Sequence, residues 1–346
     1  MRERMKKVAA LLLAGVMVLG VTACGKTETA ETTGTAQTES AAVQTEAATE
    51  AEAQESTGEG YQVAVLLPGP TGYFVATKKG IDEAAKENNV TVQYADAEWD
   101  ASKQLSQAED FITKKVDLIA LCCVDSASAE KIVKSANEEN IPIVAFTNGI
   151  GDNETGEYEG LVSYIGQNEV NTGKVTGELA KTLLGDKGGK AILIEGVPGT
   201  TPQINRKKGL EEALEGSNIE IVYNQTSNWE KEEALKIVED IIQKGTEFDI
   251  VICQDDNSAT GAGQALEEAG IKDKVFVTGL GGSIDGLQAV KDGKVDGTTY
   301  MSAVEEGKKA IEVGVKYLKG ETVDPVTEIK QVEVIKDNVD TFEGEW

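Results

Sequence analysis

Histidine is absent from the 346 residues of this chain. Without imidazole there can be no Ser-His-Asp triad, no Cys-His dyad, no histidine-ligated metal and no histidine base near neutral pH. A G-x-S-x-G nucleophile motif is also missing. Asp255 and Asp256 follow a strand-like run, but adjacent side chains diverge, whereas paired catalytic carboxylates must flank one bond. We therefore expect no enzyme activity, and no catalytic residue, metal or cofactor.

Positive charge is scarce. The chain carries 33 Lys and Arg residues against 60 Asp and Glu residues, which gives a formal net charge of -27. Binding to a phosphate backbone needs clustered basic side chains, and no basic stripe appears in the sequence. We therefore expect no nucleic-acid partner.

Cysteine is rare, and no C-x-x-C or metal-ligand spacing is present. Cys122 and Cys123 are neighbours in a strand-like run and would point to opposite faces of a sheet, so they are poorly placed to bond each other. We interpret them and Cys253 as small buried hydrophobic residues. A bridge from one of them to Cys253 stays open.

Residues 1–24 have the composition of a targeting segment. Basic side chains within residues 2–7 precede the apolar run "VAALLLAGVMVLG", which is short for a membrane span, and "VTAC" ends at Cys24. This pattern resembles a bacterial lipoprotein signal, which implies that Cys24 receives a lipid and anchors an extracytoplasmic protein to the cell membrane. An ordinary signal peptide with an incidental cysteine is the alternative.

Residues 25–60 are rich in Glu, Thr and Ala and contain no aromatic residue. Such a segment cannot bury enough apolar surface to offset its conformational entropy. We predict a disordered acidic tether here.

From residue 61 onward, short apolar runs alternate with longer amphipathic ones. Strands that are nearly all apolar, alternating with helices, predict parallel sheets covered on both faces. The plan strand, Asp/Ser turn, helix, strand occurs in "VDLIALCCVDSASAEKIVKSANEENIPIVAF" and again in "FDIVICQDDNSATGAGQALEEAGIKDKVFVTG". The sequence therefore predicts an α/β fold of two doubly wound lobes, with a ligand between them at the carboxyl ends of the strands.

The Pro- and Gly-rich turn in "VLLPGPTGYF" matches neither the G-x-G-x-x-G fingerprint nor the phosphate-binding P-loop. It displays Tyr73 and Phe74 at the start of a predicted helix. Flat apolar ring faces suit the C–H surface of a sugar or another ring. Two core aromatic residues are the alternative reading.

Over residues 61–335 the order of short motifs resembles that of ribose- and galactose-type sugar-binding proteins of bacterial ABC importers, the type I periplasmic binding proteins. The matching pieces are "VLLPGPTGYF", "DSASA", "NIPIVAF", "IGQNEVNTGK", "GVPGTTPQINRKKG", "CQDDNSATGA", "VTGLGGSIDG" and "YLKGE". The resemblance implies two doubly wound parallel-sheet lobes joined by a three-crossing hinge. The first lobe would comprise residues 61–165 and 302–329, and the second residues 166–301 and 330–346, with crossings near 165–168, 301–302 and 329–331.

The resemblance also implies ten ligand-contacting positions. Aromatic or hydroxyl-binding character is retained at Tyr73, Phe74, Trp229 and Asp255. The usual polar or charged groups are replaced at Cys122, Thr147, Asn148, Ile204, Gly281 and Met301. Because an unpaired buried hydroxyl costs about 1 to 3 kcal/mol, the ligand is expected to be a sugar or a less hydroxylated, partly apolar solute.

Two further residues have expected structural roles. The spacing of Arg206 to Gly209 matches the structural arginine of the family. Asp256 is expected to cap the helix that starts near Asn257.

The resulting hypothesis is a monomeric, membrane-tethered protein that captures a small sugar-like ligand and delivers it to an ABC permease. A receptor that reports ligand binding to a signalling partner would use the same fold and stays open. A secreted enzyme is disfavoured by the missing histidine, and a cytosolic repressor by the targeting segment and the lack of a basic helix-turn-helix.

Overall fold

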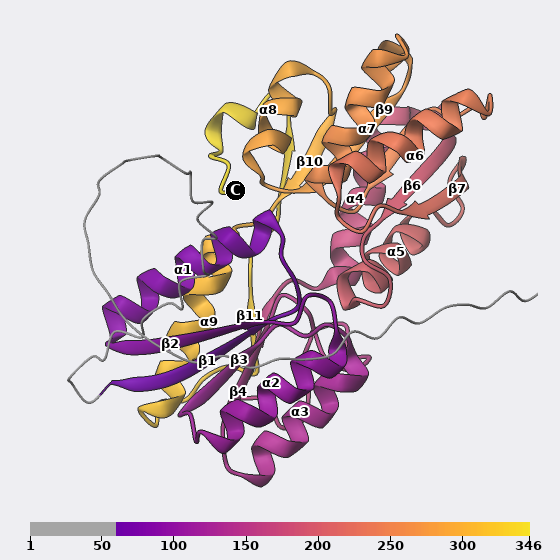
Figure 1. Cartoon of the computed structure of the whole chain (residues 1–346). Coiled ribbons are helices and arrows are strands. Elements are labelled where there is room, and N and C mark those ends of the chain that lie inside the picture. Colours follow the sequence, from indigo (N-terminus) through magenta and orange to yellow (C-terminus); the bar gives the residue numbers. More distant parts are fainter. Residues whose placement is uncertain (1–59) are drawn as a thin grey trace, which may run out of the picture. The chain divides into compact units, whose positions relative to one another are not determined.

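The computed structural model describes residues 60–346 (Figure 1). The predicted targeting segment with Cys24, and the predicted tether up to residue 59, lie outside these residues. Among the helices of the described part, none is both long and apolar enough to cross a bilayer.

Two six-stranded sheets form the framework, and their order is β2-β1-β3-β4-β5-β11 and β7-β6-β8-β9-β10-β12. The strands of the first sheet are β1 (Tyr61–Leu67), β2 (Val90–Asp96), β3 (Leu118–Leu121), β4 (Ile143–Phe146), β5 (Ser163–Gly166) and β11 (Val326–Glu328). Those of the second sheet are β6 (Gly189–Glu195), β7 (Ile219–Thr226), β8 (Ile250–Cys253), β9 (Phe276–Gly281), β10 (Gly297–Tyr300) and β12 (Val332–Ile335). Within residues 60–346 all strand pairs are parallel except β10 with β12.

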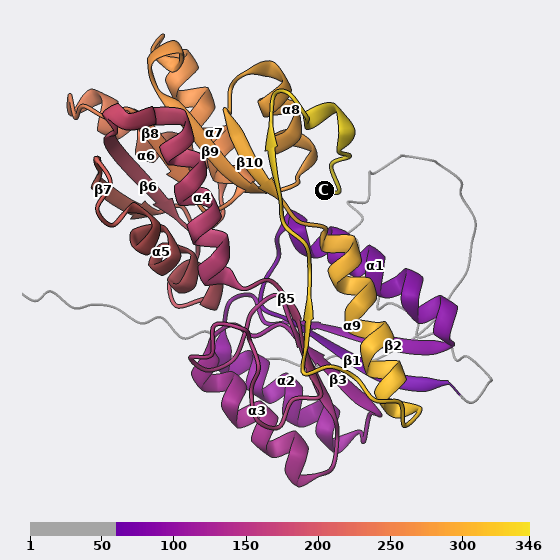
Figure 2. The same ribbon diagram turned by 180° about the vertical axis from the view of Figure 1, so that it is seen from behind.

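Helices cover both faces of the first sheet. They are α1 (Gly72–Asn88), α2 (Ala101–Thr113), α3 (Ser126–Glu138) and α9 (Ala303–Leu318). Alternate residues of β1 point to opposite faces: Val63 and Val65 pack with α1 and α9, whereas Ala64 and Leu66 pack with α2 and α3 (Figures 1 and 2). The continuous apolar run of β1 is explained by this burial on both sides. We call this sheet with its helices the first lobe.

The second lobe repeats the plan around the second sheet. Its helices are α4 (Glu169–Leu184), α5 (Thr201–Leu214), α6 (Lys231–Gln243), α7 (Asp256–Glu268) and α8 (Ile284–Asp292). Ala191 and Leu193 of β6 face α4 and α5, whereas Ile192 and Ile194 face α6, α7 and α8. Short 3-10 helices occur at Gly185–Lys187, Lys272–Lys274 and Val339–Thr341.

The chain passes between the two sheets three times. The passages run from β5 to α4 through residues 167–168, from β10 to α9 through residues 301–302, and from β11 to β12 through residues 329–331. Each lobe is therefore assembled from segments that are far apart in the sequence. The short edge strands β11 and β12 were not anticipated, because three or four residues with mixed exposure carry no clear pattern.

The three described cysteines are buried free thiols. Burial raises the pKa of each, and for Cys123 it does so to about 12. Such thiols stay neutral and unreactive. The interpretation of Cys122, Cys123 and Cys253 as small buried residues is confirmed, and the bridge to Cys253 is not formed.

Helices α4 and α5 touch backbone to backbone at two glycines. A Cβ atom on Gly209 would lie 1.8 Å from the carbonyl oxygen of Val170, and one on Gly173 would lie 2.1 Å from that of Arg206. Helices α1 and α9 make the same contact in the first lobe, where a Cβ on Gly80 would lie 2.0 Å from the Val304 carbonyl oxygen. Such contacts hold each helix pair at one fixed spacing behind its sheet.

The substitution Gly209→Ala is expected to lower the stability of the protein. The added methyl group must push α5 away from α4, and overpacking of this kind costs about 1 to 3 kcal/mol. The gain in helix propensity is only about 1 kcal/mol. Urea or thermal unfolding measures the difference, with Glu211→Ala at an exposed position of the same helix as the control. A Gly209→Ala variant as stable as the wild type would contradict the close contact.

Candidate ligand-binding site

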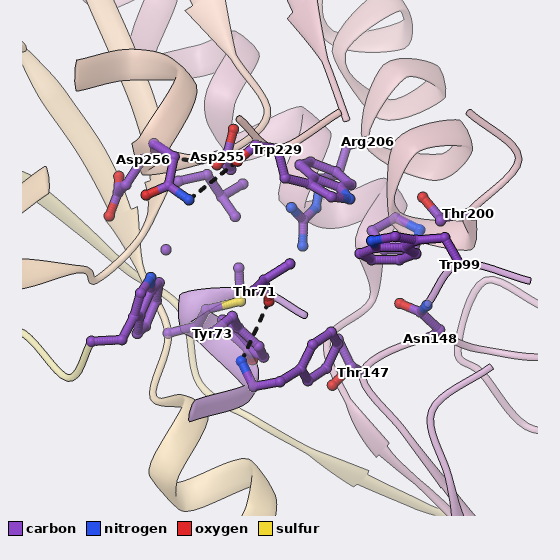
Figure 3. Close-up of a pocket in the computed structure, with 17 residues that line it drawn as sticks. Thr71, Tyr73, Trp99, Thr147, Asn148, Thr200, Arg206, Trp229, Asp255 and Asp256 are labelled. Carbon is purple, nitrogen blue, oxygen red and sulfur yellow. Dashed lines mark hydrogen bonds between the residues drawn. The ribbon is translucent and has the colours of Figure 1, made fainter. Parts of the chain in front are cut away.

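A cavity lies between the two lobes at the carboxyl ends of the strands, where open α/β sheets bind ligands (Figure 3). Counted with its opening to solvent, it has an empty volume of about 650 Å³, within the range typical of small-molecule sites. The first lobe contributes Thr71, Tyr73, Phe74, Trp99, Thr147 and Asn148. The connection between the lobes and the second lobe contribute Thr200, Pro202, Arg206, Trp229, Asp255, Asp256, Asn257, Leu280, Gly281, Met301 and Trp346.

All three tryptophans of the chain line this cavity. Trp99 follows β2 and Trp229 follows β7, so the two occupy equivalent places in the two lobes. Each is the second of two consecutive residues in the left-handed region: φ is 53° at Glu98 and 64° at Trp99, and 56° at Asn228 and 65° at Trp229. Such backbone is uncommon outside glycine, and here the same turn directs an indole into the cavity from each lobe (Figure 3).

Each of these indoles packs on a glycine. A Cβ on Gly69 would lie 2.3 Å from the Trp99 ring, and one on Gly196 would lie 1.7 Å from the Trp229 ring. A side chain at either position would expel the ring from its place. The loops after β1 and β6 therefore support two rings by close backbone contact.

Tyr73 and Phe74 enter the cavity from the start of α1. Thr71 caps this helix, and its hydroxyl accepts a hydrogen bond from the Phe74 N–H at 3.4 Å. The two rings meet edge to face with centroids 5.7 Å apart. Phe74 is also part of the core of the first lobe, so it both lines the cavity and packs in the core.

Behind Tyr73 lies the buried carboxylate of Glu306, in the first turns of α9. Its Oε2 accepts hydrogen bonds from the Tyr73 hydroxyl at 2.8 Å and from the Thr147 hydroxyl at 2.6 Å. Its Oε1 is buried without a partner among residues 60–346. Burial raises the pKa of Glu306 to about 7, against the two hydrogen bonds, which lower it. Glu306 was not anticipated, because no local pattern marks a helix residue that meets Tyr73 from 233 positions away.

Arg206 lies under Trp229, with its guanidinium carbon 5.9 Å from the ring centroid. It forms a two-pronged ion pair with Glu169, from Nε at 2.7 Å and from Nη2 at 2.8 Å. Its Nη1 donates to the carbonyl oxygen of Gln254 at 2.8 Å. The guanidinium therefore ties α4, α5 and the end of β8 together, and also lines the cavity.

The two aspartates after β8 both line the cavity, but the one that caps the next helix is not the one expected. Asp255, and not Asp256, caps α7, because its carboxylate accepts from the N–H groups of Asn257 at 3.1 Å and Ser258 at 3.3 Å. Burial raises the pKa of Asp255 to about 6. The prediction that Asp256 caps the helix is wrong.

The Asp256 carboxylate instead holds the loop after β9. It accepts from the Gly282 N–H at 2.7 Å, the Ser283 N–H at 2.9 Å and the Thr298 hydroxyl at 2.6 Å. Its oxygens are thus occupied by the protein. Helix α7 starts at Asp256, one position earlier than expected, so the capping position falls on Asp255. Sequence periodicity does not fix the first residue of a helix to within one position.

Of the ten positions expected to contact ligand, the structure brings eight to the cavity: Tyr73, Phe74, Thr147, Asn148, Trp229, Asp255, Gly281 and Met301. Cys122 and Ile204 do not line it. Cys122 lies in the core of the first lobe with no exposed surface, and Ile204 is 52% exposed on α5. Cys122 directly follows β3, where a shift of one residue reverses the direction of a side chain. Ile204 lies in α5, where a shift of one residue turns the side chain about 100° around the helix axis.

Several residues that line the cavity were not predicted from the sequence, although a local motif indicates one of them, Trp99. The motif "EWD" after the second strand of the first lobe corresponds to "NWE" after the second strand of the second lobe. Comparison of the two halves, extended to this turn, would have paired Trp99 with Trp229. Trp346, in contrast, carries no local signal.

The fold and the cavity together define a class of protein, in which two α/β lobes hold a small molecule between facing strand ends. A family model described as the periplasmic binding protein domain matches residues 63–322. The chain belongs to this family, among the ribose-type sugar- and polyol-binding proteins of ABC transporters. These are extracytoplasmic binding proteins and not enzymes. The family resemblance and the two-lobed α/β fold expected from the sequence are confirmed.

Individual relatives agree with this assignment. A xylitol-binding protein of Mycolicibacterium smegmatis is 30% identical over 338 residues, which cover 96% of this chain and 87% of the relative. A putative rhizopine-binding protein of Rhizobium meliloti is 33% identical over 273 residues, covering 77% and 87%. The crystal structure of an ABC transporter solute-binding protein from Bacillus halodurans with bound myo-inositol has a TM-score of 0.78 and 27% identity, and covers 84% of this chain and 100% of that one.

The raised pKa of Glu306 predicts a specific pH dependence of stability. Between its ordinary value of 4.5 and about 7, the folded protein holds a proton that the unfolded chain releases. The free energy of unfolding therefore falls as pH rises through this window. Glu306→Gln lacks the titrating group. As pH rises from about 4.5 to about 8, the free energy of unfolding of the wild type should therefore fall by about 1 to 3 kcal/mol more than that of this variant.

Thermal unfolding at several pH values measures this difference. Asp255 is present in both proteins, so its contribution cancels. Glu305→Gln, at the exposed neighbouring position, is the control and should follow the wild type. Parallel pH profiles for the wild type and Glu306→Gln would show that Glu306 does not titrate in this window.

Proposed function

We propose that this chain captures a neutral sugar or polyol between its lobes and delivers it to an ABC importer, while a lipid on Cys24 ties it to the outer face of the cell membrane. The observation that carries the proposal is the pair Trp99 and Trp229, which the same turn presents to one cavity from both lobes. Two flat rings on opposite lobes suit the C–H faces of a ring-shaped ligand. Membership of a sugar- and polyol-binding family supports the same ligand class.

The polar groups of the cavity fit ligand hydroxyls. Thr147, Asn148 and Asn257 are neutral hydrogen-bonding residues at its wall. The Asp255 Oδ1 accepts from both the N–H and the hydroxyl of Ser258, whereas its Oδ2 accepts only from the Asn257 N–H and keeps a lone pair for a hydroxyl donor. Arg206 is neutralised by Glu169, so the cavity offers no free cation to an acidic ligand among the residues that line it.

A partly apolar solute is the second candidate. Pro202, Leu280 and Met301 form an apolar part of the wall, and they would leave a fully hydroxylated ring with unpaired groups. A deoxy or methylated sugar places a C–H surface against these residues. Thermal-shift measurements with fully hydroxylated and with deoxy or methylated sugars, described below, decide between the two candidates.

Ligand capture would proceed by closure of the lobes about the three chain passages. Contacts across the cleft support this mechanism. The Thr201 hydroxyl of the second lobe donates to the Gly149 carbonyl oxygen of the first at 2.8 Å, and Lys208 pairs with Glu154 at 2.7 Å. The Lys208–Glu154 pair is made by exposed groups, which can separate in water when the lobes open, whereas the Thr201–Gly149 contact joins a half-buried residue to a buried one.

The protein is proposed to act as a monomer that docks on a permease. A receptor role toward a signalling partner would use the same cavity. Co-purification of the full chain with its permease, in the presence and absence of ligand, separates the two roles.

Thermal-shift measurements with xylitol, ribose, myo-inositol, D-allose and a deoxy or methylated sugar test the ligand class. A true ligand at about one hundred times its dissociation constant should add about 2.7 kcal/mol to stability. Trp99→Ala and Trp229→Ala should each weaken binding about thirtyfold, because each removes a rigid stacking face. Asp255→Asn keeps a capping residue and tests the carboxylate alone.

Tyr317→Ala is the control for these variants. Tyr317 is an aromatic residue with 45% exposure that does not line the cavity, and its removal should leave affinity unchanged. If no member of the panel stabilises the wild type, or if both tryptophan variants bind as tightly as the wild type, the proposed ligand class or site is wrong.

The lipid anchor is tested with Cys24→Ser. Loss of the thiol removes the attachment point, so the protein should move from the membrane fraction to the soluble fraction and should not incorporate labelled palmitate. Thr22→Ser, which keeps Cys24, should behave as the wild type. A Cys24→Ser protein that remains lipid-labelled and membrane-bound would refute the anchor.

A further inference from the structure

The last residues of the chain return to the cavity after β12. The Glu345 N–H donates to the carbonyl oxygen of Gly282 at 3.2 Å, and the Ile284 N–H donates to that of Trp346 at 2.8 Å. Residues 344–346 are thereby fixed to the loop between β9 and α8 of the second lobe. This loop also carries one side of the cavity, at Gly281.

The side chain of Glu345 fixes the same segment to the passage between the lobes. Its carboxylate accepts from the Tyr300 hydroxyl at 3.0 Å, the Ser302 hydroxyl at 2.5 Å and the Val304 N–H at 2.9 Å. Tyr300 is the last residue of β10 in the second sheet, whereas Val304 lies in the first turn of α9 in the first lobe. The position of residues 344–346 therefore depends on both lobes.

The indole of Trp346 lies between two glycines from opposite lobes. A Cβ on Gly72, the first residue of α1, would lie 2.4 Å from its Cδ1, and a Cβ on Gly281, at the end of β9, would lie 3.0 Å from its Cζ2. The ring also meets Tyr73 edge to face, with centroids 5.1 Å apart at an angle of 74°. Gly72 and Gly281 thus form the two sides of a slot for the Trp346 ring. The ring fits because neither residue has a side chain. We call this space the glycine slot.

We propose that residues 344–346 form a wall of the ligand cavity and that Trp346 is a specificity-determining residue, which limits the occupant to about the size of one sugar ring. The inference rests on the proposed function. With the indole in the glycine slot, the cavity ends at Trp346. Without it, the cavity extends past Gly281 into a space as large as a bicyclic side chain, which a second ring can enter.

Two features favour ligand contact over a purely structural role. Trp346 is only partly buried and lines the cavity, so one part of its ring faces the space that the ligand fills. Its indole N–H has no acceptor among residues 60–346 in the hydrogen bonds of this structure, and it remains available to a ligand hydroxyl. The contact with Tyr73 also requires the two lobes to be together, so ligand-driven closure and the Trp346–Tyr73 contact support each other.

The glycine slot can be tested without any ligand. Labelling with 5-fluorotryptophan gives one ¹⁹F signal for each of the three tryptophans, and Trp346→Phe identifies the signal of Trp346. Gly72→Ala adds a methyl group that the ring cannot tolerate, so it should shift that signal. Val75→Ala, at a position of the same helix that is 68% exposed, should not. An unchanged Trp346 signal in Gly72→Ala overturns the glycine slot.

Specificity is tested by calorimetry with myo-inositol and D-allose as single-ring probes and trehalose as a two-ring probe. Trp346→Ala should weaken binding of the single-ring probe about tenfold and should admit trehalose, which the wild type excludes. Gly72→Ala should have the same two effects. The double variant Gly72→Ala/Trp346→Ala should bind the single-ring probe no more weakly than Trp346→Ala alone. The methyl group added at Gly72 acts only through the ring, which is already absent.

Unchanged affinity and unchanged exclusion of trehalose in Trp346→Ala would overturn the specificity role, as would additive losses in the double variant. Failure of the proposed function has a different signature. In that case the wild type binds none of the sugars or polyols, whereas the fluorine signal still reports whether Trp346 occupies the glycine slot.

Discussion

Parallel strands bring all their carboxyl ends to one edge of a sheet, and the cavity depends on this constraint. Loops that leave β1, β2 and β4 of the first lobe meet those that leave β6, β7, β8 and β9 of the second. Side chains from many separate segments therefore converge on one space, while the apolar strands behind them are buried on both faces. The close glycine contacts between α4 and α5, and between α1 and α9, hold the outer layers at fixed distances. The residues of the site are consequently held within each lobe by the sheet that carries them.

Buried charge in this protein serves to hold elements rather than to perform chemistry. The Arg206–Glu169 pair joins two helices and the end of β8, and Asp256 satisfies two N–H groups of the loop after β9. Each charged nitrogen or oxygen of these groups has at least one hydrogen-bond partner, which makes the burial of the charge tolerable. Glu306 is different, because one of its oxygens is buried without a partner and burial raises its pKa. Its carboxylate accepts hydrogen bonds from Tyr73 and Thr147 and so supports a ring of the cavity from behind.

The two lobes repeat one design, and the departures from that design concentrate in the cavity. Trp99 and Trp229 occupy equivalent turns, and each rests on a glycine of the preceding strand–helix loop. Trp346 has no counterpart in this symmetry. It reaches the cavity through a segment held by the second lobe and packs against Tyr73 of the first. The two α/β lobes therefore enclose the cavity from two sides in the same way. Residues 344–346 add a further wall on one side and change the shape of the cavity.

The sequence alone determined the α/β class and the two parallel sheets, and the family resemblance that it carries brought some of the ring and polar residues to the cavity, including Tyr73, Trp229 and Asp255. The fold class and the sheets follow from local periodicity, and the place of the cavity follows from the rule that loops after parallel strands share one edge. The residues of the cavity, in contrast, were implied by the resemblance to a known family. Only the tertiary structure decided that Asp255 caps α7, that Cys122 and Ile204 point away from the cavity, and that Glu306 supports Tyr73. It also decided the place of Trp346 between Gly72 and Gly281, three residues that are separated by most of the chain. Such contacts depend on side-chain direction to within one residue and on which distant segments meet, and neither is encoded in a local pattern.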